Sequence, residues 1–279
     1  MFAAFISAIS SASNDVMLKT LLGKWKVPLK QYLPGIFILL AICMLAISPF
    51  GFQFDGEKAF TLKFILFFAG MIGTAVIWNT LIAKSLQKEA LHEYELIILM
   101  APLITMLMAG ILFPEERESK AFIAGVVASV ALAVSRIRKH HLVFSTSAKG
   151  TLLAVFFMGV ESIFVKELLV VFSPVLLNCA RVIVIAIVFL YIYKPSFKNI
   201  APKNVGLMAV SAVFGAMIMV AKFTAFKQIG VVQTTLILLL GPVLTYAASY
   251  FYFKEKKNFM RDALAAAVVI IAIAYVNII

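Results

Sequence analysis

Residues 174–193 read PVLLNCARVIVIAIVFLYIY, a run of 20 residues in which Arg181 is the one charged side chain. Such a run matches the hydrocarbon core of a bilayer, about 30 Å thick, at a helical rise of about 1.5 Å per residue. Similar apolar runs follow one another along the 279 residues, with short polar joints between them. The sequence therefore predicts an all-α membrane protein.

The composition agrees with this class, since 63% of the residues are hydrophobic and 14% are charged. A soluble domain carries about 25% charged residues. Ten spans are predicted, which makes the chain a multi-pass integral protein of a bilayer, expected in the cell (inner) membrane. The spans cover residues 2–22, 32–50, 61–83, 92–112, 121–135, 150–170, 174–193, 205–226, 231–252 and 262–279.

Several classes of protein are excluded by charge and motif. The net charge is +12, but Lys and Arg lie mainly in the joints, where they anchor helix ends and meet anionic lipid, so nucleic acid is not expected as a partner. Cys43 and Cys179 lie inside apolar runs and are too few for a disulfide scaffold or a structural zinc site. No phosphate loop, ATP-binding motif or catalytic cluster is present, so we expect no enzyme, no metal and no cofactor.

The two halves of the chain, residues 1–140 and 141–279, resemble each other. A shift of 140 residues pairs Pro102 with Pro242, Thr105 with Thr245 and Glu115 with Glu255, and a shift of 147 pairs Lys19 with Lys166. Each half then holds five spans. Because five is odd, corresponding helices cross the membrane in opposite directions. The pattern predicts two inverted five-helix repeats around a central cavity, an arrangement suited to alternating access.

Local motifs resemble the drug/metabolite transporter superfamily in its ten-helix EamA branch. The first span holds Ser13-Asn14 followed by Lys19, the third holds Gly73-Thr74-Ala75 and Trp78, and the fourth and ninth hold Ala101-Pro102 and Gly241-Pro242. The resemblance covers nearly the whole chain. It implies ten helices around a cavity lined by the third, fourth, eighth and ninth helices, which places Trp78 and Asn79 at the cavity. It also implies that both termini lie inside the cell.

Glu161 is the clearest candidate for a solute or proton site, because it lies midway along the sixth span among aromatic residues. A charge near the bilayer centre costs at least about 2.5–3.5 kcal/mol, so such residues face a cavity or a partner. The repeat places Glu161 opposite Asn14. A structural hydrogen bond to a neighbouring helix is the alternative for Glu161.

Glu93 and Glu95 open the fourth span and are further candidates to bind a cation or a proton, although acids are also favoured near a helix N-terminus by its dipole. Arg181 lies inside the seventh span and is expected either to pair with Glu161 or Glu95 or to bind an anionic substrate. Lys222, on the eighth span, could neutralise an acid of the cavity or snorkel to an interface.

Pro102 and Pro242 occupy matching places in the fourth and ninth spans. A proline inside a helix removes one hydrogen bond and commonly kinks the helix, so these two residues are candidates for symmetric gating kinks or for fixed packing features.

The charge pattern and the family resemblance predict opposite orientations of the chain in the membrane. The joints after odd-numbered spans carry 16 Lys and Arg residues, and the opposite joints carry six. The positive-inside rule then places the richer side in the cytoplasm and both termini outside, against the family resemblance.

The leading hypothesis is a secondary active transporter, driven by a gradient or by exchange, of a small polar metabolite such as an amino acid or an amine, with protons as an alternative partner. A lipid or lipid-phosphate flippase is the alternative function, since Arg181, Lys222 and a basic loop could guide a phosphate. The sequence specifies neither the substrate nor the oligomeric state.

Overall fold

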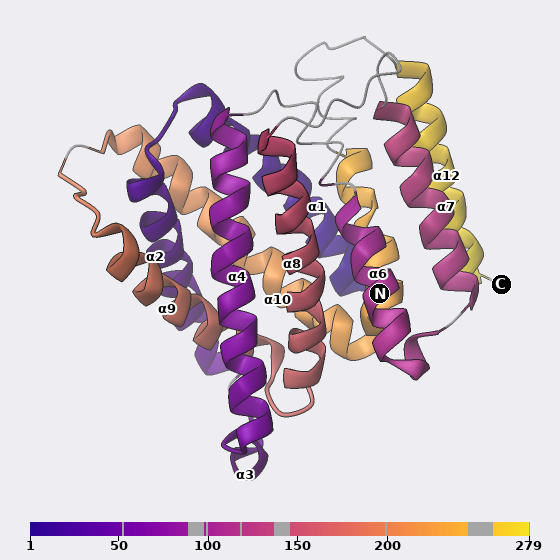
Figure 1. Cartoon of the computed structure of the whole chain (residues 1–279), viewed down its shortest axis with the longest axis horizontal. Helices are drawn as coiled ribbons and strands as arrows, with labels where there is room; N and C mark the ends of the chain where they lie inside the picture. Colours follow the sequence, from indigo (N-terminus) through magenta and orange to yellow (C-terminus); the bar gives the residue numbers. More distant parts are fainter. Residues whose placement is uncertain are drawn as a thin grey trace.

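The computed structural model describes residues 1–51, 53–88, 98, 100–117, 119–136, 146–198, 200–244 and 259–278. The regular elements of these ranges are helices, apart from an isolated β-bridge between Phe54 and Phe172. Figure 1 shows the longer helices side by side as a bundle. The predicted all-α class is confirmed.

The described residues of the first half of the chain form six elements of at least six residues. They are α1 (Phe2–Leu18), a π-helix at Lys19–Lys24, α2 (Leu29–Ile47), α4 (Leu62–Lys88), α6 (Met100–Leu112) and α7 (Ser119–Arg136). Short elements follow α2 and α6, namely 3-10 turns at Ser48–Phe50 and Pro114–Glu116 and the one-turn helix α3 at Gly56–Ala59. The Asp55 carboxylate begins α3 by accepting a hydrogen bond from the Lys58 backbone N–H.

The second half contains α8 (Thr146–Leu168), α9 (Pro174–Tyr193), α10 (Pro202–Leu238) and α12 (Phe259–Ile278). The start of α9 is specified by its sequence, because the Ser173 hydroxyl accepts a hydrogen bond from the Leu176 N–H and Pro174 occupies the first turn. α10 contains a break at Gly230, which has φ +80° and ψ 173°. Figure 1 shows the two limbs of α10 meeting at this bend.

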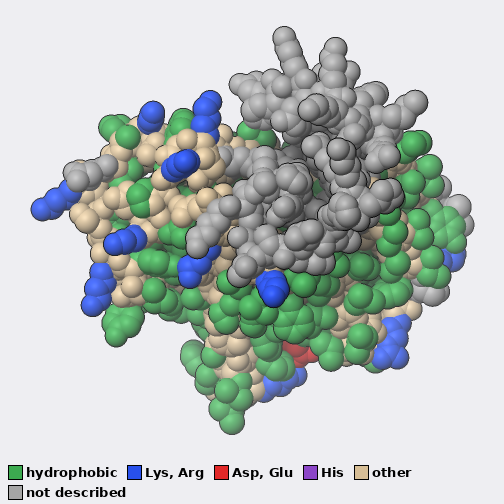
Figure 2. Space-filling view, turned by 45° about the horizontal axis from the view of Figure 1, so that its top comes forward, with side chains coloured by type: hydrophobic (Ala, Val, Ile, Leu, Met, Phe, Trp, Pro, Cys, Tyr) green, Lys and Arg blue, Asp and Glu red, His purple; other side chains and the backbone are tan. Residues whose placement is uncertain are grey.

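Four helical stretches of the described ranges are long and apolar enough to cross a membrane: Leu29–Phe50, Leu62–Gln87, Pro174–Tyr193 and Pro202–Leu244. Met100–Leu112, Lys120–Leu132 and Ala263–Val276 are shorter apolar helices. The space-filling view in Figure 2 shows hydrophobic side chains over much of the exposed flank, as expected for a protein surrounded by lipid. An integral membrane protein is thereby supported, while the count of ten spans stays a prediction.

Two long helix pairs make the most extensive contacts between described helices. α1 packs along the first limb of α10, and α4 packs along α8. Both pairs run antiparallel: Ser7 contacts Ile218 while Asn14 contacts Ser211, seven residues further along α1 and seven earlier on α10. In the other pair, Lys63 contacts Glu167 and Trp78 contacts Glu161. α2 packs on α9, and α7 packs on α12.

The two ends of the bundle differ in charge. One end, here the lysine end, is where the Gln87 side chain meets the Val27 carbonyl and the Gln31 side chain meets the Ser196 carbonyl. Its exposed lysines form no ion pair with a described acidic side chain; they are Lys24, Lys26, Lys30, Lys84, Lys149, Lys194, Lys198 and Lys203. Figure 2 shows several basic side chains on the left of the view, with others near the centre and along the lower and right edges.

The opposite end, here the paired end, joins its basic groups to acids. Lys58 pairs with Asp55 at 3.0 Å, and Lys63 pairs with Glu167 at 2.9 Å. Backbone hydrogen bonds also join its loops, as from the Asp55 N–H to the Val171 carbonyl. Among the described joints, those at Val27 and Ser196 lie at the lysine end, and those at Asp55 and Val171 lie at the paired end.

Candidate functional site

An interior cluster of charged and polar side chains joins four helices. Arg181 of α9 donates from Nε to the Glu161 Oε1 of α8 at 2.6 Å. Trp78 of α4 donates from its indole N–H to the other Glu161 oxygen, also at 2.6 Å. Both carboxylate oxygens are therefore engaged, and the predicted alternative of an Arg181–Glu161 pair is confirmed as a contact.

Burial makes this pair energetically demanding. The residue Glu161 is 6% exposed and Arg181 is 2% exposed. Two charges are tolerated at a site with so little solvent exposure because each neutralises the other. Removing one partner of such a pair lowers the free energy of unfolding by about 3–5 kcal/mol. Charges inside membrane proteins face the bundle interior and mark functional sites more often than they serve stability.

Lys222 of α10 extends the cluster. It lies close enough to Glu161 and Arg181 to interact with both electrostatically. Its Nζ lies 5.2 Å from the centre of the Phe226 ring, where the ring's negative face attracts a cation. Lys222 is less deeply buried than Arg181. With Glu161 ionised, these three groups carry a formal charge of one positive unit.

Two buried polar atoms of α9 lack a hydrogen-bond partner among the described residues: Arg181 Nη2 and Asn178 Oδ1. Asn178 instead uses its amide N–H₂, which approaches the Met44 sulfur at 3.2 Å. An unsatisfied buried polar atom costs about 1–3 kcal/mol, and more when it is charged. Such atoms are expected where a protein holds water or a ligand.

Asn14 makes the matching contact in the other helix pair. The Ser211 hydroxyl of α10 donates to the Asn14 Oδ1 of α1 at 2.6 Å, as Trp78 of α4 donates to Glu161 of α8. The Asn79 amide donates to the Ala75 carbonyl of its own helix at 2.8 Å, and its place at a cavity stays a prediction.

The remaining candidates are less informative. Glu93 and Glu95 lie outside the described residues. Pro102 lies in α6, close to residues outside the described ranges, so its role as a kink stays a prediction. α10 ends at Leu238, whose carbonyl would have accepted the N–H that Pro242 lacks, so this helix is interrupted where proline chemistry predicts.

A second polar centre, here the paired-end latch, joins Glu116, Lys166, Val231 and Val232. Glu116 follows α6 and is 7% exposed. Its two carboxylate oxygens accept hydrogen bonds from the backbone N–H groups of Val231 at 2.9 Å and Val232 at 3.0 Å. Glu116 therefore caps the N-terminus of the second limb of α10, where unsatisfied N–H groups and the helix dipole favour an anion.

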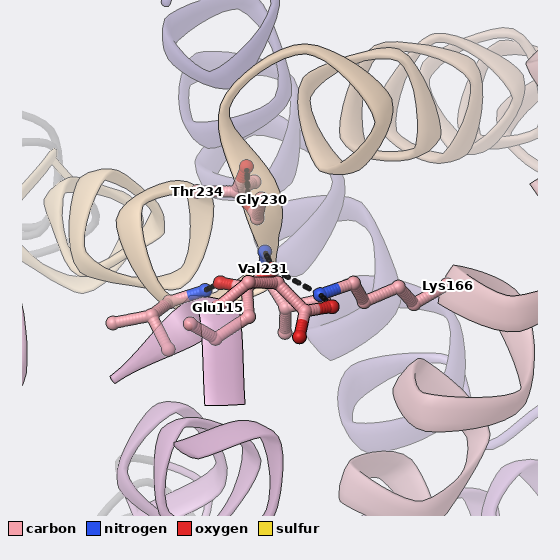
Figure 3. Close-up of polar contacts among 7 residues, drawn as sticks. Glu115, Lys166, Gly230, Val231 and Thr234 are labelled. Carbon is pink, nitrogen blue, oxygen red and sulfur yellow. Dashed lines mark hydrogen bonds and ion pairs between the residues drawn. The ribbon is translucent and has the colours of Figure 1, made fainter. Parts of the chain in front are cut away.

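Lys166 holds both acids that follow α6. Its Nζ lies 2.7 Å from Glu116 and 3.0 Å from Glu115, and 4.0 Å from the centre of the Phe113 ring. A hydrogen bond from its own backbone N–H, and then one from Lys166, lowers the pKa of the exposed Glu115 carboxyl. Figure 3 shows Lys166 reaching from α8 toward the bend of α10.

Gly230 makes the latch possible. Its φ of +80° disfavours L side chains, and a Cβ placed there would lie 2.6 Å from one Glu116 oxygen and 2.7 Å from the other. The Thr234 hydroxyl donates to the Gly230 carbonyl at 2.6 Å. Glycine is therefore required at this position for two reasons: it permits the positive φ at the bend, and it leaves room for the Glu116 carboxylate.

The sequence analysis missed the latch. Glu115 and Lys166 entered it as members of matched pairs of the repeat, whereas Glu116 and Gly230 were assigned no role. A usable signal was present, since an acidic pair follows the fourth span and a glycine stands directly before the ninth.

A cavity of about 420 Å³ lies elsewhere, between the start of α1, the end of α2 and α10. Its lining is mainly apolar and includes Phe2, Ile6, Ile47, Met217 and Val220 but none of the four residues of the interior cluster. No group of three or more His, Cys, Asp or Glu side chains in the described ranges could hold a metal ion.

Comparison with known proteins agrees with this architecture. A crystal structure described only as that of a protein superposes with a TM-score of 0.77, covering 99% of this chain and 96% of that chain at 12% sequence identity, which establishes a shared fold. No curated protein sequence matches the chain. Residues 147–278 match the sequence model of the EamA-like transporter family. The resemblance predicted from the motifs is confirmed over residues 147–278, which are similar to the EamA-like transporter family, a family of membrane transporters within the drug/metabolite transporter superfamily.

Proposed function

We propose that this protein is a secondary active transporter that moves a small polar metabolite, such as an amino acid or an amine, driven by a gradient or by exchange. The observation that carries the proposal is the interior cluster of Trp78, Glu161, Arg181 and Lys222. It draws on α4, α8, α9 and α10, so residues from both halves of the chain surround three charged groups inside an apolar bundle. A scaffold with no solute to bind has no need of such charges.

The proposed architecture is two inverted repeats, residues 1–140 and 141–279, that exchange conformations. The repeat pairs α1 with α8 and the first limb of α10 with α4, so it relates the α1–α10 pair to the α4–α8 pair. In support, both pairs are antiparallel, and the matched residues Asn14 and Glu161 each accept a hydrogen bond across their own pair. Symmetry of this kind favours alternating access.

The proposed orientation follows the same charges. The positive-inside rule assigns the lysine end to the cytoplasm, in a cell (inner) membrane, and both termini to the opposite side. A reporter fused after Ile279 tests this assignment, and reporter activity in the cytoplasm would contradict it. The flippase alternative receives no support from the family match, and nothing in the cluster favours it.

Transport is tested with purified protein in liposomes. We expect saturable uptake of labelled amino acids or amines that changes when a pH gradient is imposed. Glu161→Gln should lower the rate, whereas Glu167→Gln is the matched control, because it removes a carboxylate from the same helix at the paired end. Folded protein that moves none of these solutes faster than empty liposomes, under a gradient or in exchange, would exclude the proposal.

A further inference from the structure

We infer that the interior cluster binds the carboxylate of the transported solute, with Arg181 and Lys222 as the groups that receive it. This inference rests on the proposed function and specifies its substrate class: a carboxylic acid such as an amino acid, rather than a simple amine. Three observations carry the inference, and each concerns a different property of the cluster.

The first observation is the balance of charge. Arg181 is matched by Glu161 at 2.6 Å. Lys222 forms no ion pair with a described acidic side chain, although it lies within electrostatic reach of both residues. With Glu161, Arg181 and Lys222 all ionised, one positive charge is left over in an apolar interior. A solute that brings one negative charge neutralises the cluster, whereas an amine adds to the imbalance.

The second observation is the unused hydrogen-bonding capacity of Arg181. Its Nε serves Glu161, but Nη2 is buried and has no partner among the described residues. A guanidinium presents its N–H groups in a planar fork that fits carboxylate oxygens. Because both Glu161 oxygens are already engaged, by Arg181 and by Trp78, a second carboxylate suits Nη2 better than a rearranged Glu161 does.

The third observation is the placement of the two cations on different helices. Arg181 belongs to α9, and Lys222 belongs to α10, where its Nζ lies 5.2 Å from the centre of the Phe226 ring and within electrostatic reach of Arg181. One carboxylate can therefore interact with both cations. A single surplus charge also favours a monoanion over a dianion such as a phosphate monoester, which would leave the cluster with excess negative charge.

Trp78 provides a direct measurement of binding. Trp25 and Trp78 are the two tryptophans of the chain, so a Trp25→Phe background leaves an indole that is hydrogen-bonded to the cluster itself. Sodium acetate is the probe. Ethylammonium chloride, sodium chloride and sodium phosphate at equal ionic strength are the comparisons. We expect a saturable change of fluorescence with acetate, none with ethylammonium or chloride, and a weaker response to phosphate.

Two variants test the assignment. Lys222→Met should weaken acetate binding at least about tenfold, as expected for a charged hydrogen bond. Lys227→Met is its control, because it removes an exposed lysine from the same helix. Arg181→Lys retains a positive charge beside Glu161 but lacks the fork, and should weaken binding as well.

The inference is overturned if acetate gives no saturable response, if ethylammonium gives an equal one, if phosphate binds more tightly, or if Lys222→Met binds acetate as the unmodified protein does. Its failure is distinguishable from failure of the proposed function. Solute uptake without acetate binding refutes the carboxylate site alone. Acetate binding without transport of any solute refutes the transporter and leaves the anion site in place.

Discussion

Glu116→Gln is the substitution that most directly tests the paired-end latch. Glutamine has nearly the shape of glutamate, so the packing around the side chain is retained. Its single carbonyl oxygen can accept from the N–H of Val231 or of Val232, but its amide N–H₂ then faces the other N–H group. The variant therefore leaves one buried backbone donor without an acceptor.

The magnitude follows from these contacts. An unsatisfied buried donor costs about 1–3 kcal/mol. Loss of the negative charge at the start of the second limb of α10 adds about 0.3–1 kcal/mol from the helix dipole. Lys166 loses its 2.7 Å partner but keeps Glu115. We expect the free energy of unfolding to fall by about 3 kcal/mol.

The measurement is equilibrium unfolding in mixed micelles, titrated with a denaturing detergent and followed by helical circular dichroism. Glu115→Gln is the matched control, since Glu115 contacts the same lysine but its side chain is 65% exposed. An exposed ion pair is screened by solvent and contributes little. Equal losses for the two variants, or no loss for Glu116→Gln, would refute the capping role.

Other predictions concern the same bend, the interior cluster and the paired end. Gly230→Ala should lower the free energy of unfolding by at least about 1–2 kcal/mol, because alanine disfavours a positive φ and its Cβ meets the Glu116 carboxylate; a stability equal to that of the unmodified protein in the same titration would contradict this geometry. Trp78→Phe should lower the free energy of unfolding by about 1.5–3 kcal/mol, because the Glu161 carboxylate loses a hydrogen-bond donor while the aromatic packing is largely kept. A decrease below about 0.5 kcal/mol, the smallest contribution expected of a hydrogen bond, would argue against that bond. Hydrogen bonds from Lys58 lower the pKa of Asp55, so this carboxylate should stabilise the fold above its ordinary pKa and lose the effect as pH falls; Asp55→Asn should flatten the acid side of a stability-versus-pH curve, and an unchanged slope would exclude the contribution.

Much of the fold follows from local sequence. Apolar runs such as residues 174–193 are as long as a bilayer is thick, so their helical state and their boundaries were predictable. The Arg181–Glu161 contact was predictable as one of two pairings, because an unpaired charge inside an apolar span requires a partner. The choice between Glu161 and Glu95 depended on how α8 and α9 pack.

The latch was beyond the reach of such reasoning. Glu116 and Val231 are 115 residues apart, and no periodicity relates a carboxylate in one loop to the backbone of another. The unsatisfied Nη2 of Arg181 was equally unpredictable from the sequence, because it depends on which of the five guanidinium N–H groups form hydrogen bonds with the neighbouring helices. Pairings between distant segments are decided by the whole fold rather than by any one stretch.

The single-residue joint at Gly230 has a mechanical consequence. The first limb of α10, residues 202–229, is about 42 Å long at a rise of about 1.5 Å per residue. Because Glu116 holds the bend, a rotation of this limb would pivot at the paired end. A tilt of only about 10° would swing its far tip by about 7 Å at constant hydrogen bonding along the limb. A small rotation at one face of the membrane would thereby become a solute-sized displacement at the other.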